Sequence, residues 1–89
     1  MLISPDEINK SLSRKGWNYK NKKITKSFKF DTYMDGIEFM NKTALLAETH
    51  NHHPDMNVGW CSVNVFISSH DLGGVTTKCV NLAMGIDLI

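Results

Sequence analysis

Residues 61–68, Cys-Ser-Val-Asn-Val-Phe-Ile-Ser, alternate apolar and polar side chains and form the clearest strand pattern in the sequence. Successive side chains of a β-strand point to opposite faces, so this pattern predicts one face on a core and one face in water. Phe66 alone breaks the polar side. We therefore expect this strand to lie in a sheet that is covered on one face only.

The segments on either side of this strand predict a second strand and a helix. Residues 56–60 precede it as a short strand, and Gly73-Gly74 follows it as a turn. Thr76 can then cap a last helix. The apolar positions of this helix are Val80, Ala83, Met84 and Leu88.

The N-terminal third predicts a short helix followed by a hairpin. Ser4-Pro5-Asp6-Glu7 has the cap, first-turn proline and acidic partner of a helix start, and Gly16 supplies a left-handed stop. Residues 17–20 and 24–30 then read as strands joined by an Asn21-Lys22 turn. Three apolar side chains of the second strand share one side: Ile24, Phe28 and Phe30.

A longer helix is predicted between the two strand pairs. Asp31 is a plausible cap, Gly36 indicates close packing or a weak point, and Asn51 and Pro54 mark the far end. The apolar stripe expected to face the sheet comprises Tyr33, Ile37, Met40, Ala44 and Ala47. The element order is α-β-β-α-β-β-α, which predicts an α+β fold over residues 1–89 as a single domain, with an antiparallel sheet and its helices on one face.

Net charge, cysteine spacing and chain length limit the partners and the compartment that we expect for the protein. Ten basic and nine acidic residues give a net charge of +1, which predicts no general attraction to nucleic acid or to an acidic membrane. No secretory signal or membrane span is visible, and Cys61 and Cys79 are too far apart for a CxxC pair, so we expect reduced thiols in a soluble, cytoplasmic protein. A core this small favours self-association. The lysines of the first third are expected on the exposed face of an edge hairpin: Lys15, Lys20, Lys22, Lys23, Lys26 and Lys29.

Histidines gather where the long helix gives way to a loop. His50, His52 and His53 lie within four positions. The pKa of a free histidine is about 6.5, so neighbouring rings can serve as an acid and a base. Pro54 favours extended backbone before it, which points His52 and His53 in opposite directions. His70, at the end of the strand over residues 62–69, can meet this cluster in space.

Other interpretations of these residues remain open. Any single histidine is more often a surface loop residue, and His50, His52, His53 and His70 are also legitimate zinc ligands, although H-x-H-H is not a zinc signature. Asp55 and Asp71 are typical turn residues. Glu48 stands one helical turn before His52, a spacing at which a carboxylate can orient an imidazole.

Several segments together resemble the pterin-4a-carbinolamine dehydratase family. The most specific are Ala47-Glu48-Thr49-His50-Asn51-His52-His53-Pro54-Asp55, Ser69-His70-Asp71 and Gly73-Gly74-Val75-Thr76, with Asn57-Val58 and Val63-Asn64-Val65 between them. The resemblance covers nearly the whole chain. It implies a four-stranded antiparallel sheet with three helices on one face, assembly into a homodimer or homotetramer, and no metal or organic cofactor.

The resemblance also implies an activity and a site. The activity is dehydration of 4a-hydroxytetrahydrobiopterin in tetrahydrobiopterin recycling, with His52, His53 and His70 as catalytic residues and His50 as a bystander. The residues expected to bind the pterin substrate are Glu48, Pro54, Asp55, Ser69 and Cys79.

Cys79 departs from the family pattern. The family usually places an acid three residues after the helix-capping Thr or Ser, and here that position is Cys79. A thiol neither closes a capping box with Thr76 nor carries a charge that orients the site. This departure is the motive for an alternative function, in which the chain is a non-catalytic dimerisation cofactor that binds a transcription factor or another protein.

Overall fold

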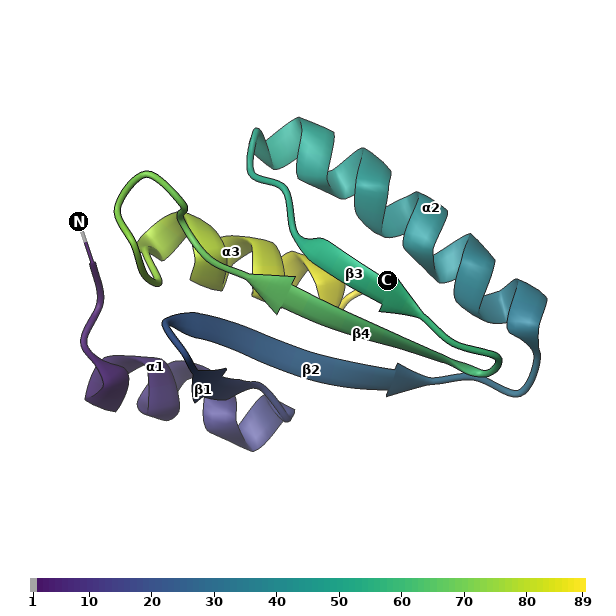
Figure 1. The fold of residues 1–89 in the computed structure, drawn as a ribbon, viewed down its shortest axis with the longest axis horizontal. Helices are drawn as coiled ribbons and strands as arrows, with labels where there is room; N and C mark the ends of the chain where they lie inside the picture. The colour runs from purple at the N-terminus through teal and green to yellow at the C-terminus, as the bar shows by residue number, and fades with distance from the viewer. Residues whose placement is uncertain (1) are drawn as a thin grey trace.

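The computed structural model describes residues 2–89 as a four-stranded antiparallel sheet with three α-helices on one face (Figure 1). The elements are α1 (Pro5–Leu12), η1 (Ser13–Lys15), β1 (Asn18–Lys20), β2 (Lys23–Lys29), α2 (Tyr33–His50), β3 (Asp55–Val58), β4 (Ser62–Ile67) and α3 (Thr77–Ile86). The strand order is β1-β2-β4-β3, so β4 lies between β2 and β3. The predicted fold class and element order are confirmed.

Local sequence signals account for the N-terminal elements. The Ser4 hydroxyl accepts a hydrogen bond from the Glu7 N–H at 3.3 Å and caps α1, and Gly16 ends the following turn with φ 88°. Asn21 and Lys22 both have positive φ, 53° and 64°, as a tight hairpin turn between β1 and β2 requires. The predicted helix start, stop and hairpin are confirmed.

The core lies between the helices and the covered face of the sheet. Ile24 of β2 pairs with Ile67 of β4, and both are fully buried. Val63 and Val65 continue the same face of β4. The helices cover this face with buried side chains: Ile8, Leu12, Phe39, Leu82, Ala83 and Ile86. The apolar side chains that alternate in residues 62–67 therefore face the core, as predicted.

Helix α2 differs from its prediction in its cap and in its buried face. Thr32, not Asp31, is the N-cap, and its hydroxyl accepts a hydrogen bond from the Asp35 N–H at 3.1 Å. Its buried residues are Gly36, Phe39, Thr43 and Ala47, whereas Tyr33 and Ala44 of the predicted stripe are exposed.

Gly36 is part of this buried face. A Cβ atom at this glycine would lie 3.4 Å from the Phe30 ring and 3.6 Å from Val63, so the helix backbone lies close to the sheet here. An apolar stripe does not include a glycine or Thr43, although both are buried. Within residues 2–89, no helix is both long enough and apolar enough to cross a bilayer.

Lys26 is a further correction, because it lies on the core side of β2 and not on the exposed face. Its Nζ is 2.7 Å from Oδ1 of Asp87, just beyond α3, and 4.9 Å from the centroid of the Phe28 ring. Trp17 Nε1 donates to Oδ2 of the same carboxylate at 2.9 Å. This cluster ties the hairpin to the C-terminal helix.

Candidate active site

The end of α2 aims the histidine segment. Asn51 adopts a left-handed conformation, φ 50° and ψ 42°, and its N–H donates to the carbonyls of Ala47 and Glu48. The His52 N–H also donates to the Ala47 carbonyl, at 3.1 Å. This closed helix end satisfies the last carbonyls and turns the chain sharply. His52 and His53 therefore leave the helix in a fixed direction.

A tight loop after β4 supplies the other side of the site. The Ser69 carbonyl accepts hydrogen bonds from the N–H groups of Leu72 at 3.1 Å and Gly73 at 2.8 Å, and the Ser69 N–H donates to the Gly74 carbonyl at 2.7 Å. Gly73 has φ 68°, which favours glycine. The loop holds His70 and Asp71 at the surface beside the end of α2.

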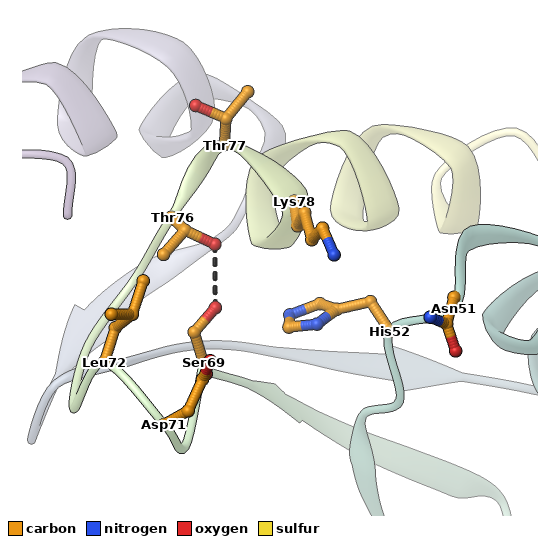
Figure 2. A pocket seen from close by; sticks show the side chains of 8 residues that line it. All are labelled: Asn51, His52, Ser69, Asp71, Leu72, Thr76, Thr77 and Lys78. Carbon is orange, nitrogen blue, oxygen red and sulfur yellow. Dashed lines mark hydrogen bonds between the residues drawn. The ribbon is translucent and has the colours of Figure 1, made fainter. Parts of the chain in front are cut away.

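Two adjoining hollows lie between these segments. The outer hollow, about 390 Å³, is lined by Asn51, His52, His53, Pro54, Asp55, Ser68, His70 and Asp71. The inner hollow, about 380 Å³, is lined by Asn51, His52, Ser69, Asp71, Leu72, Thr76, Thr77 and Lys78 (Figure 2). His52 lines both hollows, as do Asn51 and Asp71. Each volume is in the range of small-molecule sites.

His52 is partly buried, and its surroundings favour the neutral ring. Burial lowers the pKa of His52 below its ordinary value of 6.5, and the positive charge of Lys78 lowers it further. His53 and His70 act in the same direction, and the Asp71 carboxylate opposes them. At neutral pH, His52 therefore has a lone pair that can accept a proton.

His53 contacts the Glu48 carboxylate through Nε2. This partner differs from the prediction, which paired Glu48 with His52. The left-handed Asn51 ends the helix before either ring, so helical spacing no longer applies beyond it. The Glu48 side chain is 75% exposed and lines neither hollow.

A buried polar cluster stands behind His52. Ser69 Oγ and Thr76 Oγ1 are 2.7 Å apart, and each side chain is 5% exposed. Cys79 Sγ lies 3.5 Å from Ser69 Oγ, 3.6 Å from Thr76 Oγ1 and 3.2 Å from Nε2 of His52. Thr76 is the N-cap of α3, but its hydroxyl bonds Ser69 and not the helix backbone. Cys79 is fully buried and offers no surface to a substrate.

The structure thus unites most of the predicted site residues. His52, His53, Pro54, Asp55 and His70 line the outer hollow, and Ser69 lines the inner one.

Other residues of the site were missed or sit elsewhere. His50 lines neither hollow and lies toward α3, where a Cβ on Gly85 would be 3.6 Å from its Nε2. Lys78 and Thr77 were missed as lining residues, because nothing but their place in the first turn of α3 marks them in the sequence. Within residues 2–89, no three His, Cys, Asp or Glu side chains converge closely enough to hold a metal ion.

Comparison with known families gives a match over the full length. The family model described as pterin 4 alpha carbinolamine dehydratase matches residues 1–89. The chain belongs to this family. A relative from Sulfolobus acidocaldarius, provisionally named a pterin-4-alpha-carbinolamine dehydratase, is 38% identical over 100% of this chain and 99% of its own. One from Natronomonas pharaonis, with the same provisional name, is 36% identical over 96% of this chain and 91% of its own.

Solved structures of the family have the same fold. A protein from Brucella melitensis, described as a transcriptional coactivator/pterin dehydratase, has a TM-score of 0.91 and 30% identity over 99% of this chain and 97% of its own. A pterin dehydratase-like protein described as a RuBisCO assembly factor in the alpha-carboxysome has a TM-score of 0.66 and 25% identity, covering 81% and 83%. Within the fold, relatives are thus described both as dehydratases and as assembly or regulatory proteins.

Proposed function

We propose that the chain dehydrates a 4a-hydroxytetrahydropterin to the quinonoid dihydropterin, with His52 and His70 as its proton acceptor and donor and with His53 holding the substrate. One observation carries the proposal: the three rings, from two separate segments, line one hollow of about 390 Å³. Membership in the family supplies the substrate class. We place the reaction in tetrahydrobiopterin recycling in the cytoplasm, where free cysteines such as Cys61 and Cys79 stay reduced.

The reaction needs one acid and one base and no external oxidant or reductant. The C4a–O bond breaks, the acid gives its proton to the departing hydroxyl, and water leaves. A ring nitrogen of the pterin supplies the electron pair that replaces this bond, and the base takes the proton from that nitrogen. The protein ends with one proton moved from the acid to the base, and exchange with solvent restores both.

The surroundings of each ring suggest a division of these roles. His52 is held neutral and so enters as the base. His70, at the exposed tip of the 69–74 loop, is the acid that faces the hydroxyl across the outer hollow. His53 is oriented by Glu48 and holds the substrate, beside Pro54.

A stopped-flow assay with freshly generated 4a-hydroxytetrahydropterin tests the proposal. We expect the wild-type chain to accelerate loss of the carbinolamine absorbance, and His70→Ala to lose about 100- to 10,000-fold of this rate, the usual value of one acid or base. His50→Ala is the matched control, because that ring lines neither hollow. No acceleration by the wild type, or an unchanged rate in His70→Ala, would overturn the assignment.

We also propose that two copies associate through the open edge of β3. This strand lies at the end of the sheet order, and antiparallel edge pairing is self-complementary about a twofold axis. Large apolar side chains nearby are exposed: Trp60 by 82% in the β3–β4 turn, and Met34 by 66% and Leu45 by 71% on α2. A small domain gains stability by covering such a surface.

Light scattering during size-exclusion chromatography tests this association. We expect at least a dimer for the wild type, and a shift toward monomer when Trp60→Ser removes an exposed apolar side chain. Leu88→Ser is the control, because Leu88 is 88% exposed but lies near the C-terminus, outside β3 and α2. A monomeric wild type would refute self-association and favour the alternative, in which this surface binds a different protein.

A further inference from the structure

Within residues 2–89, the Cys79 thiol is the side-chain group within hydrogen-bond distance of the His52 ring. Cys79 is the third residue of α3, it has no exposed surface, and its Sγ is 3.2 Å from Nε2 of the ring. The same sulfur lies 3.5 Å from Ser69 Oγ and 3.6 Å from Thr76 Oγ1. With the 2.7 Å contact between the two hydroxyls, four polar contacts join four side chains.

Hydrogen counting distinguishes the two neutral forms of His52. The hydroxyls of Ser69 and Thr76 and the thiol of Cys79 each supply one hydrogen, which gives three hydrogens for four contacts. A hydrogen on Nε2 raises the count to four. Each contact then carries one hydrogen. One hydroxyl donates to the other hydroxyl, and that second hydroxyl donates to the sulfur. The thiol donates to the first hydroxyl, and Nε2–H donates to the sulfur. With the hydrogen on Nδ1 instead, one contact in this buried cluster has none.

We infer that Cys79 is a positioning residue, whose sulfur accepts the Nε2–H of His52 so that the unprotonated Nδ1 is left for the hollow. The inference rests on the proposed function only in giving Nδ1 its task, which is to take the proton from the pterin nitrogen. The thiol itself makes no contact with the hollow, because Cys79 is fully buried. Ser69 and Thr76 in turn hold the thiol.

The same geometry explains how a thiol can stand where the family pattern has an acid. A carboxylate at this place would also accept Nε2–H, so both groups select the same tautomer. They differ in charge, because a carboxylate stabilises the protonated ring and a neutral thiol does not.

Other charged or titratable groups around His52 do not replace that carboxylate. Lys78 on α3, His53 on its own segment and His70 on the loop all disfavour the protonated ring, and only Asp71 favours it. The cluster therefore keeps His52 in the tautomer that carries its hydrogen on Nε2. The ring is a weaker base than it would be with a carboxylate at position 79.

Nitrogen-15 NMR of the imidazole rings in the full chain, without substrate, tests the tautomer directly. Above pH 7 we expect His52 in the wild type to carry its hydrogen on Nε2. Cys79→Ala should give a mixture of both tautomers. Cys79→Ser should keep the wild-type tautomer, because a hydroxyl also accepts and donates. A hydrogen on Nδ1 in the wild type, or an unchanged tautomer in Cys79→Ala, would overturn the inference, and the wild-type measurement needs no variant to fold.

Charge is tested by Cys79→Asp, in which the pKa of His52 should rise and the acidic limb of the pH–rate profile should move to higher pH. At pH 7, Cys79→Ala should lose on the order of 10- to 100-fold in kcat, as do residues that orient a reacting group. Cys61→Ala is the matched control, because Cys61 directly precedes β4 and its thiol contacts the Asp31 carbonyl. It should change neither the pKa of His52 nor kcat. A pKa of His52 that does not rise in folded Cys79→Asp would overturn the role assigned to the missing charge.

The two proposals fail separately. If the wild type shows no dehydration but the ring carries its hydrogen on Nε2 and responds to Cys79→Ala, the proposed function fails and the positioning role stands. If dehydration is fast but the tautomer is insensitive to Cys79, the positioning role fails and the proposed function stands.

Discussion

The inner hollow is backed by buried groups, and the outer hollow is bounded by exposed ones. Ser69 and Thr76 are each 5% exposed, whereas the side chain of His53, which lines the outer hollow, is 57% exposed, and that of its partner Glu48, outside both hollows, is 75% exposed. Each side contains a close polar contact between two side chains. Contacts removed from water are stronger and cannot be replaced by solvent, so we expect the two contacts to differ in energy.

His52 takes part in both sides and shows what this difference does. Burial lowers its pKa, and the polar cluster behind it contacts Nε2 at 3.2 Å. His53, next in the chain, contacts the largely exposed carboxylate of Glu48. The fold therefore favours the neutral form of His52.

The largest expected effect separates these two neighbours by activity. His52→Ala should lower kcat/KM by about 100- to 10,000-fold, because it removes the base. His53→Ala should cost less than that range, because its ring is exposed and holds the substrate. Stopped-flow rates of both variants, with circular dichroism to verify the fold, measure the ratio. An equal or larger loss in His53→Ala would remove the distinction between the two sides.

The next effect concerns the stability of the inner side. Thr76→Val replaces a hydroxyl by a methyl group of similar shape and takes from Ser69 its 2.7 Å partner. Ser69 Oγ then keeps only its 3.5 Å contact with Cys79 Sγ. Loss of a buried hydrogen bond costs about 1 kcal/mol, and we expect a loss of about 1 to 2 kcal/mol in the free energy of unfolding measured with urea.

Thr77→Val is the matched control, one residue along at an exposed position that lines the inner hollow. Its loss should stay within about 0.5 kcal/mol. Equal losses at both threonines would mean that the buried hydroxyl pair contributes nothing specific.

Most of the fold could be predicted because its signals are local. Alternation over residues 62–67, the capping Ser4, and the turn at Asn21 and Lys22 each depend on a few neighbouring residues. The strand order β1-β2-β4-β3 and the buried face of α2 depend on contacts between distant segments. That face includes Gly36 and Thr43, which a search for apolar periodicity passes over.

The site was predictable in its residues more than in their partners. The clustering of His52 and His53 and the position of His70 after a strand indicated a shared hollow. Glu48 was assigned to the wrong ring, because helical spacing was extended past the left-handed Asn51. The contact between Cys79 and His52 joins residues 27 positions apart on different elements, and no local pattern encodes it.

A smaller effect is expected in the pH dependence of stability. Because the pKa of His52 is lowered in the folded chain, the unfolded ring binds its proton at higher pH than the folded ring does. The stability that this group contributes is thus complete above about pH 6.5 and is lost as the pH falls below that value toward the folded pKa.

Lys78→Gln should reduce this loss of stability, because Lys78 is the charged group that lowers the pKa of His52 most. NMR titration should show a higher pKa for the ring, and urea unfolding at a series of pH values should show a weaker decline on the acidic side. Lys10→Gln removes the same charge on α1 and should change neither. A pKa that stays the same or falls in Lys78→Gln would contradict the electrostatic explanation.

The smallest effect is expected on the outer side, at the contact between Glu48 and His53. Both side chains are largely exposed, and exposed ion pairs contribute about 0 to 1 kcal/mol because solvent and salt compete for both charges. Glu48→Gln, which keeps an oxygen to accept from the ring, should therefore change the free energy of unfolding by less than about 0.5 kcal/mol. The difference should vanish in high salt. A loss well above 1 kcal/mol that persists in salt would show that His53 is held as firmly as His52, and that orientation on the outer side is also fixed by the fold.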